Sequence, residues 1–538
     1  MKRTVSALLA LCLAACATAP QSPVELRILA LNDFHGNLQP PAEGFKDRSR
    51  NITVQSGGAA WLASAVREQR AGHPNHIFVA AGDLMGASPL LSALFNDEPT
   101  IEALGAMDLA ISSVGNHEFD RGADELLRRQ YGGCHPKTGC QGGHEFKGAS
   151  YHYLAASTVV EATGKTLLPA YEIRRFEGIP VGFIGLTLKG TPGIVTPSGV
   201  AGLRFDDEAE TVNRLVPQLR AQGVEAIVVL IHEGGFPTGS YNECPAISGA
   251  IVDIVKKLDK AVDLVVSGHT HMAYNCRIDG RLVTSADKYG NVLTAIDLKL
   301  DRKTGDVISA QAENMIVDHA RFQPDPAVQQ LIAGYDQRSA PLVQRVIGHI
   351  SQTLTREQDA AGATTMGQLI ADAQLVATAG DAQIAITNIG GVRSELSFRN
   401  GGAVSYGDAF TVQPFYNNLV TLTLSGAQLR QALEQQWLDQ PKFRPLQVSR
   451  GFAYRWDAAK PLGQRVVDMR LNGQPIAADA SLRITVTTFL AAGGDGFKAF
   501  TEGSARHTGM QDIDALEQYL QSQPLTQPPA LDRVVRIN

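Results

Sequence analysis

Residues 115–120, with the sequence GNHEFD, place an amide, an imidazole and two carboxylates within six positions. They follow the run at 109–114, whose length and β-branched content predict a buried strand. Ligands of α/β proteins collect at the carboxyl ends of strands, so this junction is a candidate site. Taken alone, the same residues could simply cap a helix.

Four further apolar runs end in the same way, at 26–31, 76–81, 226–231 and 264–267. They are followed by Asn32-Asp33-Phe34-His35, Gly82-Asp83, His232-Glu233-Gly234-Gly235 and Gly268-His269-Thr270-His271. Helix caps and isolated hydrogen-bonding residues could explain any one of these junctions, but they explain five poorly. The repeated pattern therefore predicts one shared site at the ends of several strands.

Carboxylates, imidazoles and one amide oxygen, without a thiolate, suit divalent Zn or Mn. Seven candidate ligands are too many for one tetrahedral ion and indicate two: Asp33, His35, Asp83, Asn116, His232, His269 and His271. We expect Asp33 and His35 to bind one ion, and Asn116 and His232 to bind the other. Asp83 can bridge them, with His269 and His271 divided between the pair. Two ions about 4 Å apart can clamp a phosphate and generate a hydroxide for in-line attack.

His117 and Asp120 are left free of metal in this scheme and form the predicted catalytic pair. His117 can stabilise charge on the transferring phosphoryl group or protonate the leaving oxygen. Asp120 can orient the imidazole and favour its protonated form.

The chain of 538 residues is long enough for two large domains, and 44% hydrophobic with 19% charged residues describes a globular protein. A net charge of −6 without a Lys/Arg-rich run argues against a nucleic-acid polymer as partner. We expect an α/β domain over residues 24–321, a linker helix over 322–345 and a mixed α+β domain over 346–538. The helix should begin near Pro324-Asp325-Pro326.

The N-terminus predicts export. Lys2 and Arg3 precede an apolar stretch at 5–15 that is too short for a membrane span, so residues 1–15 form a predicted signal peptide. Leu13-Ala14-Ala15-Cys16 resembles the bacterial lipobox, which implies lipidation of Cys16 and a tether over 16–23. The alternative is ordinary signal-peptide cleavage at a small residue, in which Cys16 has no role. We expect a lipoprotein of the bacterial cell envelope that faces the periplasm, with its lipid anchor in the membrane.

Four cysteines remain in the mature chain: Cys134, Cys140, Cys244 and Cys276. An even number in an exported protein predicts two disulfides, and the sequence permits three pairings. We favour Cys134–Cys140, which closes a Gly-rich loop, together with Cys244–Cys276. A metal site formed by Cys134, Cys140 and His144 ranks below the disulfide.

The five junctions, in this order, resemble those of the calcineurin-like metallophosphoesterases. Three later motifs resemble the C-terminal domain of the secreted 5′-nucleotidase family: NIGGVR at 388–393, QPF at 413–415 and FLAAGGDGF at 489–497. This resemblance covers nearly all of the mature chain. It implies a four-layered α/β/β/α catalytic domain, a linker helix, and a substrate domain that rotates to bring a nucleotide to the metals.

The resemblance also implies a nucleotide site in the second domain. By position, Phe415 and Phe489 match two aromatic residues that sandwich the base. Asp495 matches an acid near the ribose or base. Asn388 and Arg393 match residues that contact the nucleotide.

Two positions depart from the pattern of the family. Relatives usually carry an arginine six residues before the Met366-Gly367 pair, where this chain has Ala360, and we expect Arg356 to supply the charge. His271 stands where several relatives have an amide. The imidazole is still a suitable ligand, but the preferred metal can differ.

The expected activity is hydrolysis of nucleoside 5′-monophosphates to nucleoside and phosphate, with two divalent ions, Zn or Mn, as cofactors. The alternative is a 2′,3′-cyclic nucleotide phosphodiesterase/3′-nucleotidase or a UDP-sugar hydrolase that uses the same metals. A non-catalytic nucleotide-binding lipoprotein is a remote alternative. The expected partner is therefore a small nucleotide, and the sequence does not specify an oligomeric state.

Overall fold

A computed structural model describes residues 22–195, 197–438, 440 and 442–538. The predicted signal peptide, the lipidation site Cys16 and most of the tether lie outside these residues. Within the described part of the chain, no helix is both long and apolar enough to cross a membrane.

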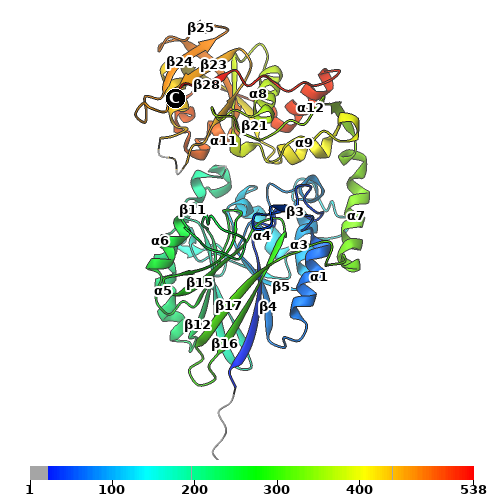
Figure 1. Cartoon of the computed structure of the whole chain (residues 1–538), viewed down its shortest axis with the longest axis vertical. Coiled ribbons are helices and arrows are strands. Elements are labelled where there is room, and N and C mark those ends of the chain that lie inside the picture. Colours follow the sequence, from blue (N-terminus) through cyan, green and yellow to red (C-terminus); the bar gives the residue numbers. More distant parts are fainter. Residues whose placement is uncertain (1–21, 196, 439, 441) are drawn as a thin grey trace, which may run out of the picture.

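Two six-stranded sheets form the centre of the first domain (Figure 1). The first sheet has the order β17 (Val307–Ile316), β16 (Val292–Leu300), β1 (Val24–Leu31), β4 (His76–Ala80), β5 (Leu109–Ser113) and β6 (His152–Leu154). The second has the order β14 (Ala273–Ile278), β15 (Arg281–Ala286), β13 (Leu264–Ser267), β12 (Ala226–His232), β10 (Ile179–Thr187) and β9 (Tyr171–Phe176). Strands β1, β4 and β5 are parallel, as are β10, β12 and β13, so the carboxyl ends within each group lie at one edge.

Helices cover the outer face of each sheet, which gives four α/β/β/α layers and confirms the predicted fold class. Along β1, Leu26 and Ile28 point into the core between the sheets, whereas Leu29 and Leu31 pack against helices. The first sheet is covered by α1 (Ala59–Arg70), α2 (Leu90–Ala93), α3 (Glu98–Ala106) and α4 (Ala123–Tyr131). The second is covered by α5 (Glu208–Arg220) and α6 (Ala250–Lys257).

The five apolar runs singled out in the sequence form β1, β4, β5, β12 and β13, with ends within two residues of those predicted. Short strands complete the domain: β2 (Phe45–Asp47), β3 (Ile52–Val54), β7 (Thr158–Val160), β8 (Lys165–Thr166) and β11 (Leu203–Phe205). The domain also contains three 3-10 turns: η1 (His117–Phe119), η2 (Thr191–Gly193) and η3 (Pro197–Val200).

Helix α7 (Pro326–Val343) connects the two domains along one side of the molecule (Figure 1). It begins after Asp325, whose carboxylate accepts hydrogen bonds from the amides of Ala327 and Val328. Its Tyr335 hydroxyl donates to Glu102 Oε2 at 3.0 Å, which fixes this helix to α3 of the first domain. The boundaries 24–321, 322–345 and 346–538 remain our proposal for the division of the chain.

The second domain is built on a five-stranded sheet of order β22 (Leu446–Val448), β19 (Ile384–Asn388), β26 (Ser481–Thr487), β21 (Asn418–Ser425) and β27 (Ser504–Gln511). A second sheet contains β25 (Gln474–Pro475), β24 (Val466–Leu471), β23 (Phe452–Trp456) and β28 (Val534–Arg536), and β18 (Val346–His349) pairs with β20 (Ala403–Ser405). The helices are α8 (Thr365–Ala377), α9 (Tyr406–Val412), α10 (Gly426–Glu434), α11 (Thr488–Ala491) and α12 (Asp512–Ser522). Further 3-10 turns are η4 (Ile389–Gly391), η5 (Asn400–Gly402), η6 (Gly494–Gly496) and η7 (Lys498–Glu502).

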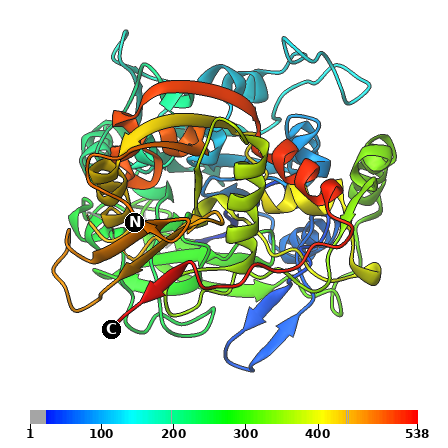
Figure 2. The same cartoon turned by 90° about the horizontal axis from the view of Figure 1, so that it is seen from above.

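The two domains lie one above the other, and the view from above shows the β2–β3 hairpin projecting at the rim (Figure 2). Helix α10 ends at Glu434. Beyond it, Trp437 stacks on Phe443, with 5.2 Å between ring centroids, and packs against Trp456.

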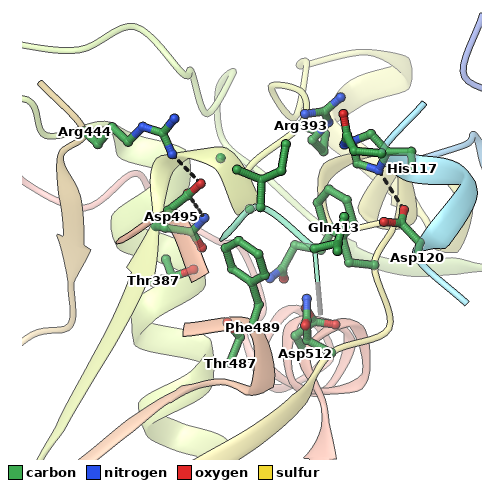
Figure 3. A pocket seen from close by; sticks show the side chains of 18 of the residues that line it. His117, Asp120, Thr387, Arg393, Gln413, Arg444, Thr487, Phe489, Asp495 and Asp512 are labelled. Atoms are coloured by element: carbon green, nitrogen blue, oxygen red, sulfur yellow. Dashed lines mark hydrogen bonds and ion pairs between the residues drawn. The ribbon is translucent and has the colours of Figure 1, made fainter. Parts of the chain in front are cut away.

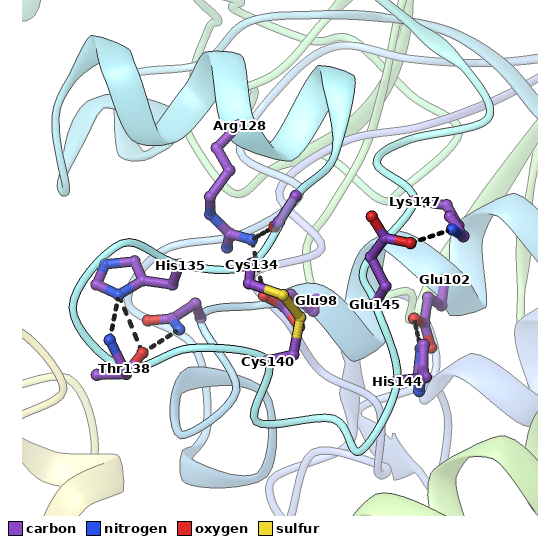
Figure 4. Close-up of a disulfide and its surroundings, with 12 residues drawn as sticks. Glu98, Glu102, Arg128, Cys134, His135, Thr138, Cys140, His144, Glu145 and Lys147 are labelled. Carbon is purple, nitrogen blue, oxygen red and sulfur yellow. Dashed lines mark hydrogen bonds and ion pairs between the residues drawn. A yellow bond between two sulfur atoms is a disulfide. The ribbon is translucent and has the colours of Figure 1, made fainter.

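Both favoured disulfides are present, Cys134–Cys140 and Cys244–Cys276. His144, which the alternative metal site requires, hydrogen-bonds through Nε2 to Glu102 Oε1 at 2.6 Å (Figure 4). The cysteine sulfurs are therefore engaged with each other, and that metal interpretation is wrong.

Candidate active site

The ends of β1, β4, β5, β12 and β13 bring all seven predicted metal ligands together. In one group the ligand atoms of Asp33, His35 and His271 lie within 4.8 Å of one another, and in a second those of Asp83, His232 and His269 do so. Asn116 joins the second group, because its Oδ1 lies 3.0 Å from His269 Nδ1. A third group of His35, Asp83 and His117 connects the first two.

Five of these seven residues have left-handed backbone conformations. Their φ angles are 50° for Asp33, 46° for His35, 49° for Asp83, 71° for His269 and 55° for His271. Non-glycine residues adopt positive φ uncommonly, and such strain concentrates at functional sites. These turns direct side chains from separate strand ends towards one centre.

The hydrogen bonds of two histidines determine which ring nitrogen is available to a metal. His35 Nδ1 lies 2.8 Å from the Gly86 carbonyl and His232 Nδ1 lies 2.7 Å from the Ala81 carbonyl. A carbonyl oxygen only accepts, so both Nδ1 atoms carry a proton, and Nε2 is the ring nitrogen that each histidine can offer to a metal. A metal-binding histidine typically donates its second nitrogen to a carbonyl in this way.

The two Nε2 atoms face other predicted ligands. His232 Nε2 is buried and lies 3.0 Å from Asp83 Oδ2. His35 Nε2 lies 3.0 Å from His271 Nε2, and 3.8 Å from carboxylate oxygens of both Asp33 and Asp83. Such a cluster of buried nitrogen and oxygen atoms is suited to bind divalent cations. Asp83 lies between both groups, as a bridging carboxylate would.

Two glycines permit this close approach of the strand ends. A Cβ atom at Gly115 would lie 2.2 Å from Asp83 Oδ1, and one at Gly82 would lie 2.9 Å from His232 Nδ1. Real Cβ contacts are almost never so short, so both positions require glycine for the ligand geometry.

Two buried residues that received no role from the sequence orient the ligands. The Glu118 carboxylate accepts hydrogen bonds from the amides of Gly115, Asp83 and Leu84, which ties the end of β4 to the end of β5. Asn32 Nδ2 donates to Asp33 Oδ2 at 2.6 Å. The only indication of these roles in the sequence is that both residues lie inside the motifs NDFH and GNHEFD.

His117 and Asp120 form the predicted pair at the cavity wall (Figure 3). His117 Nδ1 lies 2.7 Å from Asp120 Oδ2, so Nε2 is available to a substrate. Burial alone would lower the pKa of His117, but the Asp120 and Asp83 carboxylates outweigh it and raise that pKa above its ordinary value. The pair can therefore supply a cation or a proton at this position.

A cavity of about 220 Å³ lies between the two domains. The first domain contributes Asn116, His117, Asp120, Ile194, Val195 and His269 to its wall. The second contributes Asn388, Arg393, Gln413, Phe415, Phe489 and Asp495, among others. Five of the six substrate residues expected from the family resemblance thus line one space with the predicted catalytic pair.

The predicted substrate residues are held mainly by one another. Asp495 accepts hydrogen bonds from Asn388 Nδ2 at 2.7 Å and from Arg444 at 2.6 Å (Figure 3). The Arg393 guanidinium lies 5.8 Å from the Phe415 ring centroid. Burial lowers the pKa of both His35 and His271, and the charge of Arg393 lowers it further. Arg393 lines the same cavity as the predicted ligands Asn116 and His269.

Phe415 also stacks on His117, with 6.0 Å between ring centroids and 18° between ring planes. Arg356, the sixth expected residue, is absent from the cavity wall and donates to the Arg393 carbonyl at 3.1 Å. Arg444 is a wall residue that the sequence did not single out.

Two sequence-family models match the chain. The model described as calcineurin-like phosphoesterase matches residues 26–273, which include the whole metal-ligand cluster. The model described as 5′-nucleotidase, C-terminal domain, matches residues 346–502, which include the predicted nucleotide residues.

Among characterised proteins, the chain is 34% identical to "Endonuclease YhcR" of Bacillus subtilis over 94% of its own length, and it spans 40% of that relative. It is 30% identical to "Cell wall protein Lmo0130" of Listeria monocytogenes, over 94% of this chain and 68% of the relative. The solved structure of a 5′-nucleotidase precursor from Thermus thermophilus superimposes with a TM-score of 0.78 at 26% identity, covering 96% of this chain and 99% of that one.

Proposed function

Because this chain belongs to the 5′-nucleotidase family of metal-dependent phosphoester hydrolases, we propose that it cleaves nucleoside 5′-monophosphates to nucleoside and phosphate. One observation carries the proposal: a single cavity joins the metal-ligand cluster and the His117–Asp120 pair to the aromatic residues Phe415 and Phe489. A nucleotide matches this arrangement, because it has a phosphate at one end and a flat base at the other.

Two divalent ions are the cofactors that the donor set supports, with Zn or Mn suited to its nitrogen and oxygen atoms. Asp33, His35 and His271 would hold one ion, and Asn116, His232 and His269 the other, with Asp83 between them. Bound ions would supply Lewis-acid polarisation of the phosphoryl oxygens and would activate water as the nucleophile that displaces the nucleoside 5′-oxygen from phosphorus.

Side chains of the protein would position the substrate and supply a proton and positive charge. The raised pKa of His117 keeps a proton available for the leaving 5′-oxygen, and Asp120 holds the ring in place. Arg393 adds a second cation beside the phosphoryl group.

The nucleoside end is supplied by the second domain. Phe415 and Phe489 are only partly buried and both line the cavity, so both rings can contact a base there. The Asp495 carboxylate, fixed by Asn388 and Arg444, is suited to ribose hydroxyls.

The test is hydrolysis by the purified chain with Mn or Zn, and then with a chelator, with the products separated by chromatography. The panel contains AMP, 3′-AMP, 2′,3′-cyclic AMP, a UDP-sugar and, because of the similarity to YhcR, a single-stranded DNA. Chelator-sensitive release from AMP supports the proposal. Hydrolysis of only another member of the panel reassigns the substrate, and no hydrolysis with metal bound favours a binding protein.

We also propose that the chain is exported and held at the membrane through Cys16. Support comes from the two disulfides, which persist in oxidising compartments. Cell fractionation with metabolic lipid labelling tests this, and loss of the label in Cys16→Ala is the expected result. A labelled variant would contradict lipidation at this cysteine.

A further inference from the structure

Tyr416 is held in a strained backbone conformation directly beside the cavity residue Phe415. It lies between α9 and β21 and has a φ of 53°. Positive φ is an outlier for a bulky residue, and it persists only where surrounding contacts hold the residue in place. Glycine would adopt this conformation without strain, so the presence of a large ring here indicates that the ring itself has a role.

The Tyr416 ring lies at the contact between the two domains. Within its own domain it packs against Phe410 of α9, with 5.0 Å between ring centroids. From the first domain, the guanidinium carbon of Arg121 lies 5.9 Å from the Tyr416 centroid, within the range of a cation–π interaction. Arg121 and Tyr416 therefore join the catalytic domain directly to the nucleotide-binding domain.

The chain around α2 holds Arg121 in place and itself packs on the second domain. The Arg121 guanidinium donates to the carbonyl oxygen of Ala93 at 3.2 Å and to the side-chain oxygen of Asn96. Leu90 and Ala93 of α2 belong to the same buried apolar cluster as Phe410. The contact thus combines apolar packing, which has no preferred direction, with a cation held above a ring, which restricts how the domains are rotated.

The two stretches of chain that form this contact also carry residues of the proposed reaction. Asp120 directly precedes Arg121 and is hydrogen-bonded to His117. Phe415 directly precedes Tyr416 and stacks on the His117 ring. A change in the contact therefore alters the position of Phe415 relative to His117.

We propose that Arg121 and Tyr416 are positioning residues, which hold the two domains in the arrangement that brings a nucleotide phosphate to the metal-ligand cluster. This rests on the proposed nucleotidase function. Neither residue is among the described residues of the cavity wall, so both act through their neighbours and not by contact with substrate. Their loss should affect every phosphate ester equally, whereas the loss of a stacking ring affects only substrates that have a base.

The decisive experiment is a double-mutant cycle with Arg121→Met and Tyr416→Leu. Methionine removes the cation and keeps an unbranched side chain, whereas leucine removes the ring and makes the same demand on the backbone. Either variant should lower kcat/KM about fivefold, as expected for one lost cation–π contact, and equally for AMP and ribose 5-phosphate. The double variant should be no worse than the poorer single variant, because both substitutions remove one contact. Additive losses, or a loss confined to AMP, would overturn the proposal.

Two further variants serve as controls. Tyr416→Phe keeps the ring beside Arg121 and should retain the wild-type kcat/KM, so a loss equal to that of Tyr416→Leu would contradict a role of the ring. Arg536→Met removes a cation that lies 5.4 Å from the Trp456 centroid, but both of these residues belong to the second domain. It should leave hydrolysis unchanged, and an effect as large as that of Arg121→Met would exclude a specific role for the contact between the domains.

A measurement without substrate separates this proposal from the proposed function. Small-angle X-ray scattering of the wild-type protein should match the curve calculated from this structure, and the curve of Arg121→Met should differ from it. Arg121 is exposed, so this variant should remain folded, with an unchanged unfolding temperature. A changed curve supports the positioning contact even if the wild-type protein hydrolyses no AMP. Identical curves of wild type and variant overturn it, even if AMP is hydrolysed.

Discussion

The two ends of the cavity are organised by different means. At the metal-ligand end, left-handed turns of one domain set the side chains, and carbonyl groups fix the histidine tautomers. At the nucleoside end, side chains from loops of the other domain hold one another, as Asn388 and Arg444 hold Asp495. Backbone geometry thus fixes the chemistry, while recognition depends on individual side chains. Substitutions at the first end should abolish turnover, and those at the second should change the ranking of substrates.

The largest effect is expected from Asp83→Asn, which removes the charge shared by both ligand groups. Turnover should fall about 10,000-fold, because metal ions supply several kcal/mol of transition-state stabilisation. Metal analysis should show fewer bound ions, while calorimetry should show unchanged adenosine binding. Asp297→Asn, which affects only a pair with Arg27 on the surface, is the control and should behave as wild type. Loss of adenosine binding in Asp83→Asn would contradict the separation of the two ends.

His117→Ala separates catalysis from metal binding at the metal-ligand end. Turnover of AMP should fall about 1,000-fold, since a positioned acid or cation is lost. Metal content should stay unchanged, because Asp120 and not a metal engages Nδ1. The third ligand group includes His117, so a loss of metal in this variant would show that it is a ligand instead.

Gly115→Ala tests whether backbone geometry organises the ligands. The new Cβ would lie 2.2 Å from Asp83 Oδ1, so the carboxylate must move, and about 100-fold of the activity should be lost. Gly334→Ala in α7, where the nearest neighbouring atom lies at 3.5 Å, should leave activity intact and raise stability slightly. Equal activity of both variants would count against the role of the turn.

The smallest effect is expected from Phe489→Leu at the nucleoside end. KM for AMP should rise about tenfold through the loss of one stacking face. Hydrolysis of ribose 5-phosphate, which has no base, should be unaffected by the substitution. An equal loss for both substrates would mean that Phe489 supports the fold and not the base.

The difference between the two ends also explains what the sequence could predict. The five strand ends carry their ligands directly after apolar runs, so local patterns were sufficient to find Asp33, His232 and the others. Arg444 and Asp495 are 51 residues apart, and neither position marks the ion pair in the sequence. Gln413 was visible as part of a motif, but its burial in the cavity wall follows only from the packing of the folded chain.

The left-handed turns limit which residues can replace the predicted metal ligands. Asp, Asn and His are the non-glycine residues most often found at positive φ, and they are also metal ligands. Exchange among them at Asp33, His35, Asp83, His269 or His271 therefore changes the ligand atoms while the turn is retained. Single substitutions at these positions can therefore change the metal preference of such a protein while the backbone stays the same.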